Sequence, residues 1–208
     1  LLVFDFSSTD AEHDRAIGKI RDICQASEIP VIAAGNIKRM EDVKKLIYAG
    51  CAKVVLNFSK ENNIKLLEEV SRRFGKERMM ISIYDLREFT ENQDLIEKYA
   101  DTVLALDTVE NEIAEISQIS IVLHTDENRS ENILELLGEP AVSGLCGAYV
   151  SSLENDLHTF KETCEEAGIP VNTYKSNIAW SDFKLNSDGM VPVIVQDYRT
   201  DEVLMLAY

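Results

Sequence analysis

The sequence has little positive charge for its length. Against 37 Asp and Glu it contains only 21 Lys and Arg, so its formal net charge is −16 at pH 7. A surface this acidic repels a nucleic-acid backbone and anionic lipid headgroups, which argues against nucleic acid and membrane as general partners. Any phosphate group that the protein binds must therefore be held locally.

The sequence also lacks paired cysteines, long apolar runs and clustered histidines. Its four cysteines lie far apart with no C-x-x-C pair, which favours a reduced, cytoplasmic protein. No apolar run approaches the roughly 20 residues that span a bilayer, and no basic region leads into an apolar one at the N-terminus. The three histidines, His13, His124 and His158, have no spacing typical of a metal site, so we expect them at the surface or in capping roles.

Two apolar runs flank an amphipathic segment between residues 29 and 58. The runs, IPVIAA and VVL, do not alternate with polar residues as a strand with one solvated face would. Strands that are apolar on both faces are typical of a parallel sheet covered by helices. Between them, Val43, Leu46 and Ile47 share one helical face, and Gly50 supplies a left-handed stop. The stretch predicts a β-α-β crossover.

Similar units repeat along most of the chain. The expected strands cover residues 1–6, 29–34, 54–56, 79–83, 102–106, 119–123 and 141–150. Amphipathic segments separate them, the first opened by a capping box between Thr9 and Glu12. Seven β-α units at spacings of about 20 to 28 residues approach a (β/α)₈ barrel. The predicted fold is α/β, TIM-barrel-like, with the first β-α unit missing.

A doubly wound open sheet is the alternative fold, since it would tolerate seven strands. That class carries a Gly-rich phosphate turn after its first strand, whereas Asp5 leads here into FSSTD and not into G-x-G-x-x-G. The barrel is therefore the preferred prediction.

After Pro170 the pattern changes. Residues 171–188 are polar and irregular, and we expect a linker there. VPVIVQD and EVLMLAY then alternate around a turn at Tyr198 to Asp201, which predicts a β-hairpin. We expect a barrel over residues 1–170 and the start of a small β-rich domain over 189–208. The chain opens and closes inside apolar runs, so we also expect it to be part of a longer protein.

Four stretches resemble families of a single pathway. LLVFDF and IPVIAAGNIKRMEDVKKLIYAGCAKVVLNFS resemble the second to fourth β-α units of the cyclase subunit of imidazole glycerol phosphate synthase and of its barrel relative, the phosphoribosylformimino isomerase of histidine biosynthesis. GLCGAYV resembles that family's eighth strand. DGMVPVIVQDYRTDEVLMLAY is similar to the N-terminal segment of phosphoribosyl-AMP cyclohydrolase. Together they imply a multifunctional histidine-biosynthesis protein, with a phosphoribosyl-ATP diphosphatase as an additional candidate domain.

Barrel active sites lie at the carboxyl ends of the strands. The polar residues expected there are Asp5, Asn36, Asn57, Tyr84, Asp85, Asp107, His124 and Asp126. The resemblance implies two catalytic aspartates, at the ends of the first and fifth strands. The first strand is absent, and Tyr84 occupies the fifth-strand position with Asp85 one residue late, which turns that side chain to the opposite face. Asp5, Asn57 and Asp85 remain candidate catalytic residues.

Phosphate anchors in the family are Gly-rich turns and helix N-termini. Gly35, Gly144 and Gly147 are the candidate phosphate-binding residues. The stretch HTDEN instead places Asp126 and Glu127 where a phosphate-binding turn of the family would have glycines. Plainer interpretations compete with each candidate. Asp5 is also a typical helix cap and Asn57 a typical turn residue, and the last two glycines are equally consistent with barrel packing.

The main functional hypothesis is a degenerate cyclase-like barrel that serves as a structural or assembly module ahead of a phosphoribosyl-AMP cyclohydrolase. The resemblance implies a cytoplasmic hydrolase acting on a small phosphorylated, nucleotide-like metabolite, with Zn²⁺ and Mg²⁺ as cofactors and a possible homodimer through the cyclohydrolase part. Its metal-ligating motifs would lie beyond Tyr208, so no metal ligand is assigned in this chain. One alternative is an active cyclase-type lyase in which Asp85 replaces the lost acid. Another is a module that binds a phosphorylated intermediate through Gly35, Gly144 and Gly147.

Overall fold

The computed structural model describes residues 1–106, 110–126, 133–153, 156–173 and 178–208. The expected site residue Asp107 and the segment from Glu127 to Ser130 lie outside these ranges. The chain divides into two compact units, Leu1–Val171 and Asn172–Tyr208. Each unit is described by itself.

Seven strands and their connecting helices build the first unit. The strands are β1 (Leu2–Phe4), β2 (Ile32–Ala34), β3 (Lys53–Asn57), β4 (Met79–Ile83), β5 (Thr102–Ala105), β6 (Ser120–His124) and β7 (Val142–Cys146). The helices are α1 (Asp10–Ala26), α2 (Met40–Tyr48), α3 (Glu61–Phe74), η1 (Lys76–Arg78), α4 (Leu86–Thr90), α5 (Gln93–Tyr99), α6 (Glu110–Ile116), α7 (Ile133–Gly138), α8 (Ala148–Ser152) and α9 (Leu157–Glu166). No helix among the described residues is long and apolar enough to cross a membrane.

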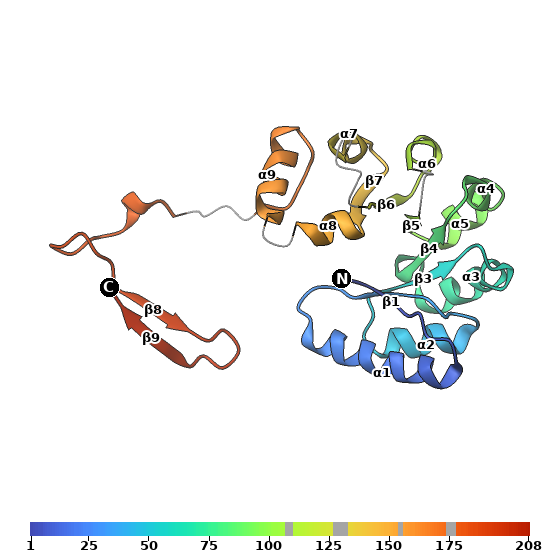
Figure 1. The fold of residues 1–208 in the computed structure, drawn as a ribbon, viewed down its shortest axis with the longest axis horizontal. Coiled ribbons are helices and arrows are strands. Elements are labelled where there is room, and N and C mark those ends of the chain that lie inside the picture. Colours follow the sequence, from blue (N-terminus) through green and yellow to red (C-terminus); the bar gives the residue numbers. More distant parts are fainter. Residues whose placement is uncertain (107–109, 127–132, 154–155, 174–177) are drawn as a thin grey trace. The chain divides into compact units, whose positions relative to one another are not determined.

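The strands follow one another in sequence order within a single parallel sheet. Figure 1 shows this sheet curling like part of a barrel, with helices along its outer side. A doubly wound sheet would reverse its strand order and carry helices on both faces, so that alternative is wrong. The predicted α/β, TIM-barrel-like architecture is confirmed, and within the described residues the sheet is open between β1 and β7.

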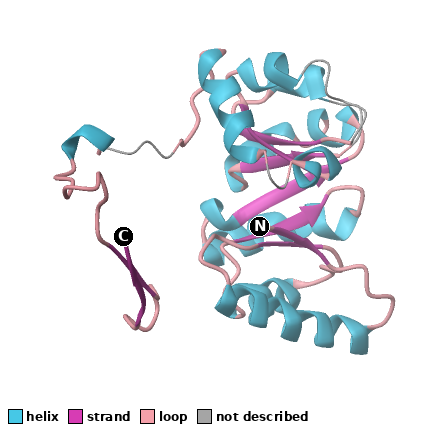
Figure 2. Cartoon of the chain, turned by 60° about the vertical axis from the view of Figure 1, so that its left-hand side comes forward, coloured by secondary structure: helices cyan, strands magenta, loops and turns pink. Residues whose placement is uncertain are grey.

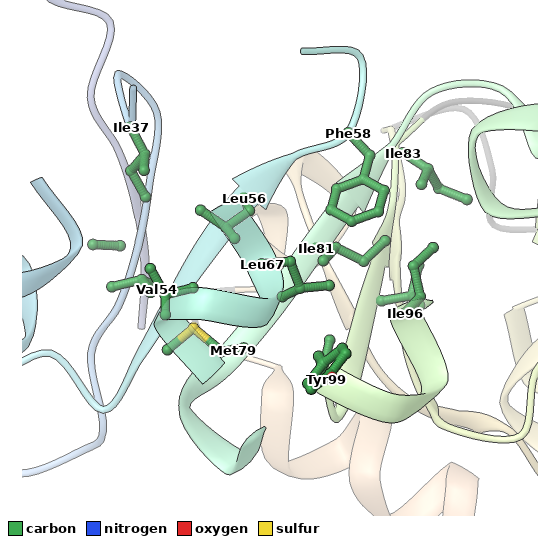
Figure 3. Close-up of a cluster of buried hydrophobic side chains, with 14 of the residues drawn as sticks. Ile37, Val54, Leu56, Phe58, Leu67, Met79, Ile81, Ile83, Ile96 and Tyr99 are labelled. Atoms are coloured by element: carbon green, nitrogen blue, oxygen red, sulfur yellow. The ribbon is translucent and has the colours of Figure 1, made fainter. Parts of the chain in front are cut away.

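Alternate residues of the strands enter two separate apolar clusters. Val54, Leu56 and Ile81 face outward into the larger cluster, which the helices cover. Figure 3 shows this layer, with Leu67 from α3 and Ile96 from α5 packed among the strand residues. The inner face of the curved sheet carries the smaller cluster of Ala34, Val55, Met80, Leu104 and Leu106. Burial of both faces explains why the strand sequences are continuously apolar.

Local signals set several element boundaries. The Thr9 capping box is confirmed, because Thr9 Oγ1 accepts from the Glu12 N–H at 3.2 Å and the Glu12 carboxylate accepts from the Thr9 N–H at 3.1 Å. The strand expected over residues 141–150 is wrong in its second half. Gly147 adopts a φ of 106°, which ends the extended backbone after Cys146 and lets α8 begin at Ala148.

The second unit contains η2 (Trp180–Asp182) and a hairpin of β8 (Val193–Gln196) and β9 (Val203–Ala207). The two strands are antiparallel, and their register shifts between Val195 and Gln196. Figure 2 shows the hairpin as two strands joined by a loop. The predicted hairpin is thus confirmed.

Candidate functional site

The carboxyl ends of seven parallel strands share one edge of the sheet, and we call this edge the barrel mouth. Because the strands are parallel, residues that follow β1 to β7 are grouped there. The candidate residues that the structure describes belong to this edge or to the strands that lead to it. What each side chain contacts at that edge decides what chemistry it can perform.

Asp5 follows β1 and turns to the outer side of the sheet. Its carboxylate accepts from the Ser7 N–H at 2.8 Å and lies 2.5 Å from Nδ1 of His13 on α1. The other ring nitrogen, Nε2, makes no hydrogen bond and lies 3.9 Å from the carboxylate of Asp42 on α2. All three side chains are buried. Asp5 therefore links β1 to α1, and His13 lies between Asp5 and the Asp42 carboxylate of α2.

The electrostatics of Asp5 reflect this environment. Burial raises the pKa of its carboxyl group, but hydrogen bonds from His13 and Ser7 outweigh burial and leave the pKa below its usual value. The carboxylate is thus ionised at neutral pH and paired with a histidine. The expectation that His13 lies at the surface or caps a helix is wrong. The signal for its burial was its position one helical turn before Ile17, on the same apolar face of α1.

A tight turn after β2 lies directly against Asp5. Gly35 has a φ of 93°, and a Cβ atom there would overlap the carbonyl oxygen of Asp5. Asn36 also has positive φ, at 53°, and its side-chain amide donates to the carbonyl and hydroxyl oxygens of Ser7. Glycine is therefore required for close approach of the β1 and β2 ends, and a phosphate-binding role for Gly35 stays a prediction.

Asn57 ends β3 and bonds to its own loop. Its side-chain oxygen accepts from the N–H and the hydroxyl of Ser59, at 2.9 and 2.7 Å. Its backbone oxygen accepts from the side chain of Asn63 at 3.2 Å. This is the turn role that the sequence offered as the plainer interpretation of Asn57.

The end of β4 carries Tyr84 and Asp85. Tyr84 directly follows Ile83, the last residue of β4, and is half exposed, while its N–H donates to Glu88 at 2.8 Å. Asp85 caps α4 by accepting from the Arg87 N–H at 2.9 Å and pairs with the Arg87 guanidinium at 2.8 Å. These bonds lower the pKa of Asp85 to about 2. A carboxylate held this way is a weak proton acceptor at neutral pH.

The ends of β6 and β7 meet closely at the far side of the mouth. The Thr125 N–H donates to the Cys146 carbonyl at 2.8 Å. A Cβ atom on Gly147 would overlap the carbonyl oxygen of Thr125 and come within 3.1 Å of the His124 ring. Gly144 instead lies inside β7, opposite Val122. Gly147 is therefore required for packing at this corner, and neither glycine's phosphate role is tested.

The structure thus groups the candidates into separate places rather than one constellation. Asp5 and Gly35 meet at the β1–β2 end, His124 and Gly147 meet at the β6–β7 end, and Asn57 and Asp85 bond within their own loops. An apolar cavity of about 430 Å³ lies elsewhere, between β7, α7 and α9. Among the described residues no group of three or more His, Cys, Asp or Glu is arranged to hold a metal ion.

A singly wound, curled parallel sheet with its polar residues at the carboxyl edge defines a barrel protein of the TIM type. Comparison with known proteins gives the family. The model of the family described as histidine biosynthesis protein matches residues 1–134, and the chain belongs to this family.

Individual relatives carry the name imidazole glycerol phosphate synthase subunit HisF. The protein from Exiguobacterium sibiricum is 34% identical over 83 residues, which are 40% of this chain and 33% of the relative. The protein from Staphylococcus saprophyticus is 24% identical over 205 residues, which cover 82% of this chain and 81% of the relative. The protein from Streptococcus gordonii is 30% identical over 83 residues, again 33% of its length. In the first and third cases the match thus spans about one third of the relative.

Proposed function

We propose that the Leu1–Val171 unit is a cyclase-type barrel of histidine biosynthesis whose proton-transfer function has been lost, so that it serves as a structural or assembly module. The observation that carries this proposal is the position of Asp85. Its carboxylate caps α4 and pairs with Arg87, while Tyr84 is the residue directly after β4. Losing one general acid or base typically lowers a rate by about 10²- to 10⁴-fold.

The second unit supports a cyclohydrolase as the partner activity. Its hairpin carries the residues that resemble the start of phosphoribosyl-AMP cyclohydrolase, and β8 and β9 pair antiparallel there. In this proposal the parent protein hydrolyses the purine ring of a phosphorylated nucleotide, with Zn²⁺ and Mg²⁺ bound by residues beyond Tyr208. The parent is a cytoplasmic protein and dimerises through the cyclohydrolase part.

An active cyclase is the second candidate function, and the names of the relatives favour it. In that case the barrel would make imidazole glycerol phosphate, with Asp85 as acid or base. Asp85 would have to leave its bonds to Arg87 to reach a substrate in the mouth, which the Arg87 pairing disfavours.

A single set of assays separates these functions. The parent protein is supplied with the cyclase substrate and ammonia, and formation of imidazole glycerol phosphate is followed alongside substrate binding by calorimetry. The proposal expects neither turnover nor tight binding. Turnover that falls at least 100-fold in Asp85→Asn, and is unchanged in the matched exposed variant Asp14→Asn, would establish the active cyclase instead.

Binding without turnover would establish the third hypothesis, a module that binds a phosphorylated metabolite. Gly35 and Gly147 are poor test positions, because both are required for packing. Gly144 is suitable, since a Cβ atom there meets only Val122 at 4.0 Å. Weakened phosphate binding in Gly144→Ala, with unchanged unfolding, would place the anion at β7.

A further inference from the structure

Two of the four thiols lie against each other at the C-terminal end of α1. Cys24 is in the last turns of α1, and Cys51 lies between α2 and β3. Their sulfur atoms are 3.9 Å apart, and both cysteines are free. Cys146 in β7 and Cys164 in α9 are also free thiols on other elements. The close pair joins segments that are 27 residues apart in the chain.

The backbone around Cys51 is shaped to keep the two segments close. Gly50 has a φ of 110°, and a Cβ atom there would come within 3.0 Å of the Cys24 Cβ. A side chain at position 50 would therefore separate α1 from the end of α2. The sulfur separation must fall from 3.9 Å to about 2 Å for a disulfide to form.

We propose that Cys24 and Cys51 are a redox site that forms a reversible disulfide with small-molecule disulfides such as glutathione disulfide. The Cys24 thiolate attacks one sulfur of the oxidant, forms a mixed disulfide and releases one glutathione thiolate. Cys51, after losing its proton to solvent, attacks Cys24 Sγ and expels the second glutathione thiolate. Two protein thiols are thereby oxidised, and one glutathione disulfide is reduced to two thiols.

The environments of the two sulfurs set the order of these steps. Cys51 is fully buried, whereas Cys24 is partly exposed, so the oxidant reaches Cys24 first. Burial, together with the neighbouring Cys24, raises the pKa of the Cys51 thiol to about 12. Attack of Cys51 on the mixed disulfide is therefore the slow step. The mixed disulfide on Cys24 accumulates before the Cys24–Cys51 disulfide forms.

The Cys24–Cys51 disulfide should stabilise the first unit by constraining its unfolded chain. A disulfide that closes a loop of this size raises the melting temperature of a protein of this length by about 5 to 10 °C. It would attach α1 to the α2–β3 connection near the open β1 edge of the sheet. The reduced protein should recover its original melting temperature.

The test uses the full chain in glutathione redox buffers without denaturant. Free thiols are then alkylated, and peptides are mapped by mass spectrometry without reduction. The expected product is a Cys24–Cys51 cross-link that dithiothreitol removes. Cys51→Ser should instead carry glutathione on Cys24, and Cys24→Ser should form no cross-link.

Cys164→Ser is the matched control, because it removes a buried thiol outside the pair and should form the same cross-link. Cross-linking that appears only after unfolding would overturn the proposal. The proposal would also be overturned if the wild-type chain accumulated glutathione on Cys24 without forming the Cys24–Cys51 disulfide. An unchanged melting temperature when the cross-link is complete would overturn it too.

Discussion

The barrel strands and the hairpin strands are similar in composition and opposite in environment. Leu56 of β3 is completely buried, whereas Leu206 of β9 is 61% exposed. β3 is covered on its outer face by helices and on its inner face by the curling sheet. In β8 and β9 every residue except Ala207 is exposed. Apolar residues on both faces therefore show that a strand is suited to burial, and its neighbours decide whether burial occurs.

The same contrast appears between two carboxylates at strand ends. Asp5 and Asp85 each follow an apolar strand, and each accepts a hydrogen bond from a backbone N–H two residues later. Asp5 is buried against a histidine of α1, while Asp85 is an exposed cap paired with an arginine. A carboxylate at the end of a strand is thus insufficient to define an active site, because the direction of its side chain selects its partners.

The largest expected effect is a difference between two leucine truncations. Leu56→Ala removes a fully buried side chain and should lower the free energy of unfolding by about 2 to 5 kcal/mol. Leu206→Ala should change it by less than about 0.5 kcal/mol, because that side chain is exposed. Urea unfolding followed by far-UV circular dichroism measures both. A cost for Leu206→Ala similar to that for Leu56→Ala would mean that the hairpin faces are covered in solution.

The next effect compares two glycines that differ in backbone conformation. Gly35→Ala introduces a side chain at positive φ and against the Asp5 carbonyl, and should cost about 2 to 3 kcal/mol. Gly18→Ala is the matched control, because Gly18 lies inside α1 with open space around it. It should gain about 0.5 to 1 kcal/mol from the better helix propensity of alanine. A neutral Gly35→Ala would show that the β1–β2 end can open without cost.

The sequence predicted most of this fold because helix and strand periodicities and the Thr9 capping box are local signals. It overextended the strand at residues 141–150, because a single left-handed glycine, Gly147, ended an otherwise apolar run. The candidate site was less predictable. Whether His13 meets Asp5 and Asp42 depends on how α1 and α2 pack behind β1, which no motif encodes.

The smallest expected effect separates the two carboxylates by pH and salt. The folded pKa of Asp5 is lower than its unfolded value, so its contribution is complete above about pH 4 and is lost as the pH falls through the folded pKa. Asp5→Asn should cost about 1 to 2 kcal/mol at pH 7 and flatten the acid side of the stability curve.

Asp85→Asn should have a smaller effect at neutral pH, because asparagine still caps α4 and the Arg87 pair is exposed to solvent. Added salt of about 1 M should remove what remains of the Asp85 effect, since salt screens exposed pairs, and should leave the Asp5 effect nearly intact. Thermal unfolding of both variants between pH 3 and 7, at low and high salt, measures this. If Asp85→Asn proved the more costly and salt-resistant change, Asp85 would be held by buried contacts at the mouth, and its assignment as an exposed helix cap would be wrong.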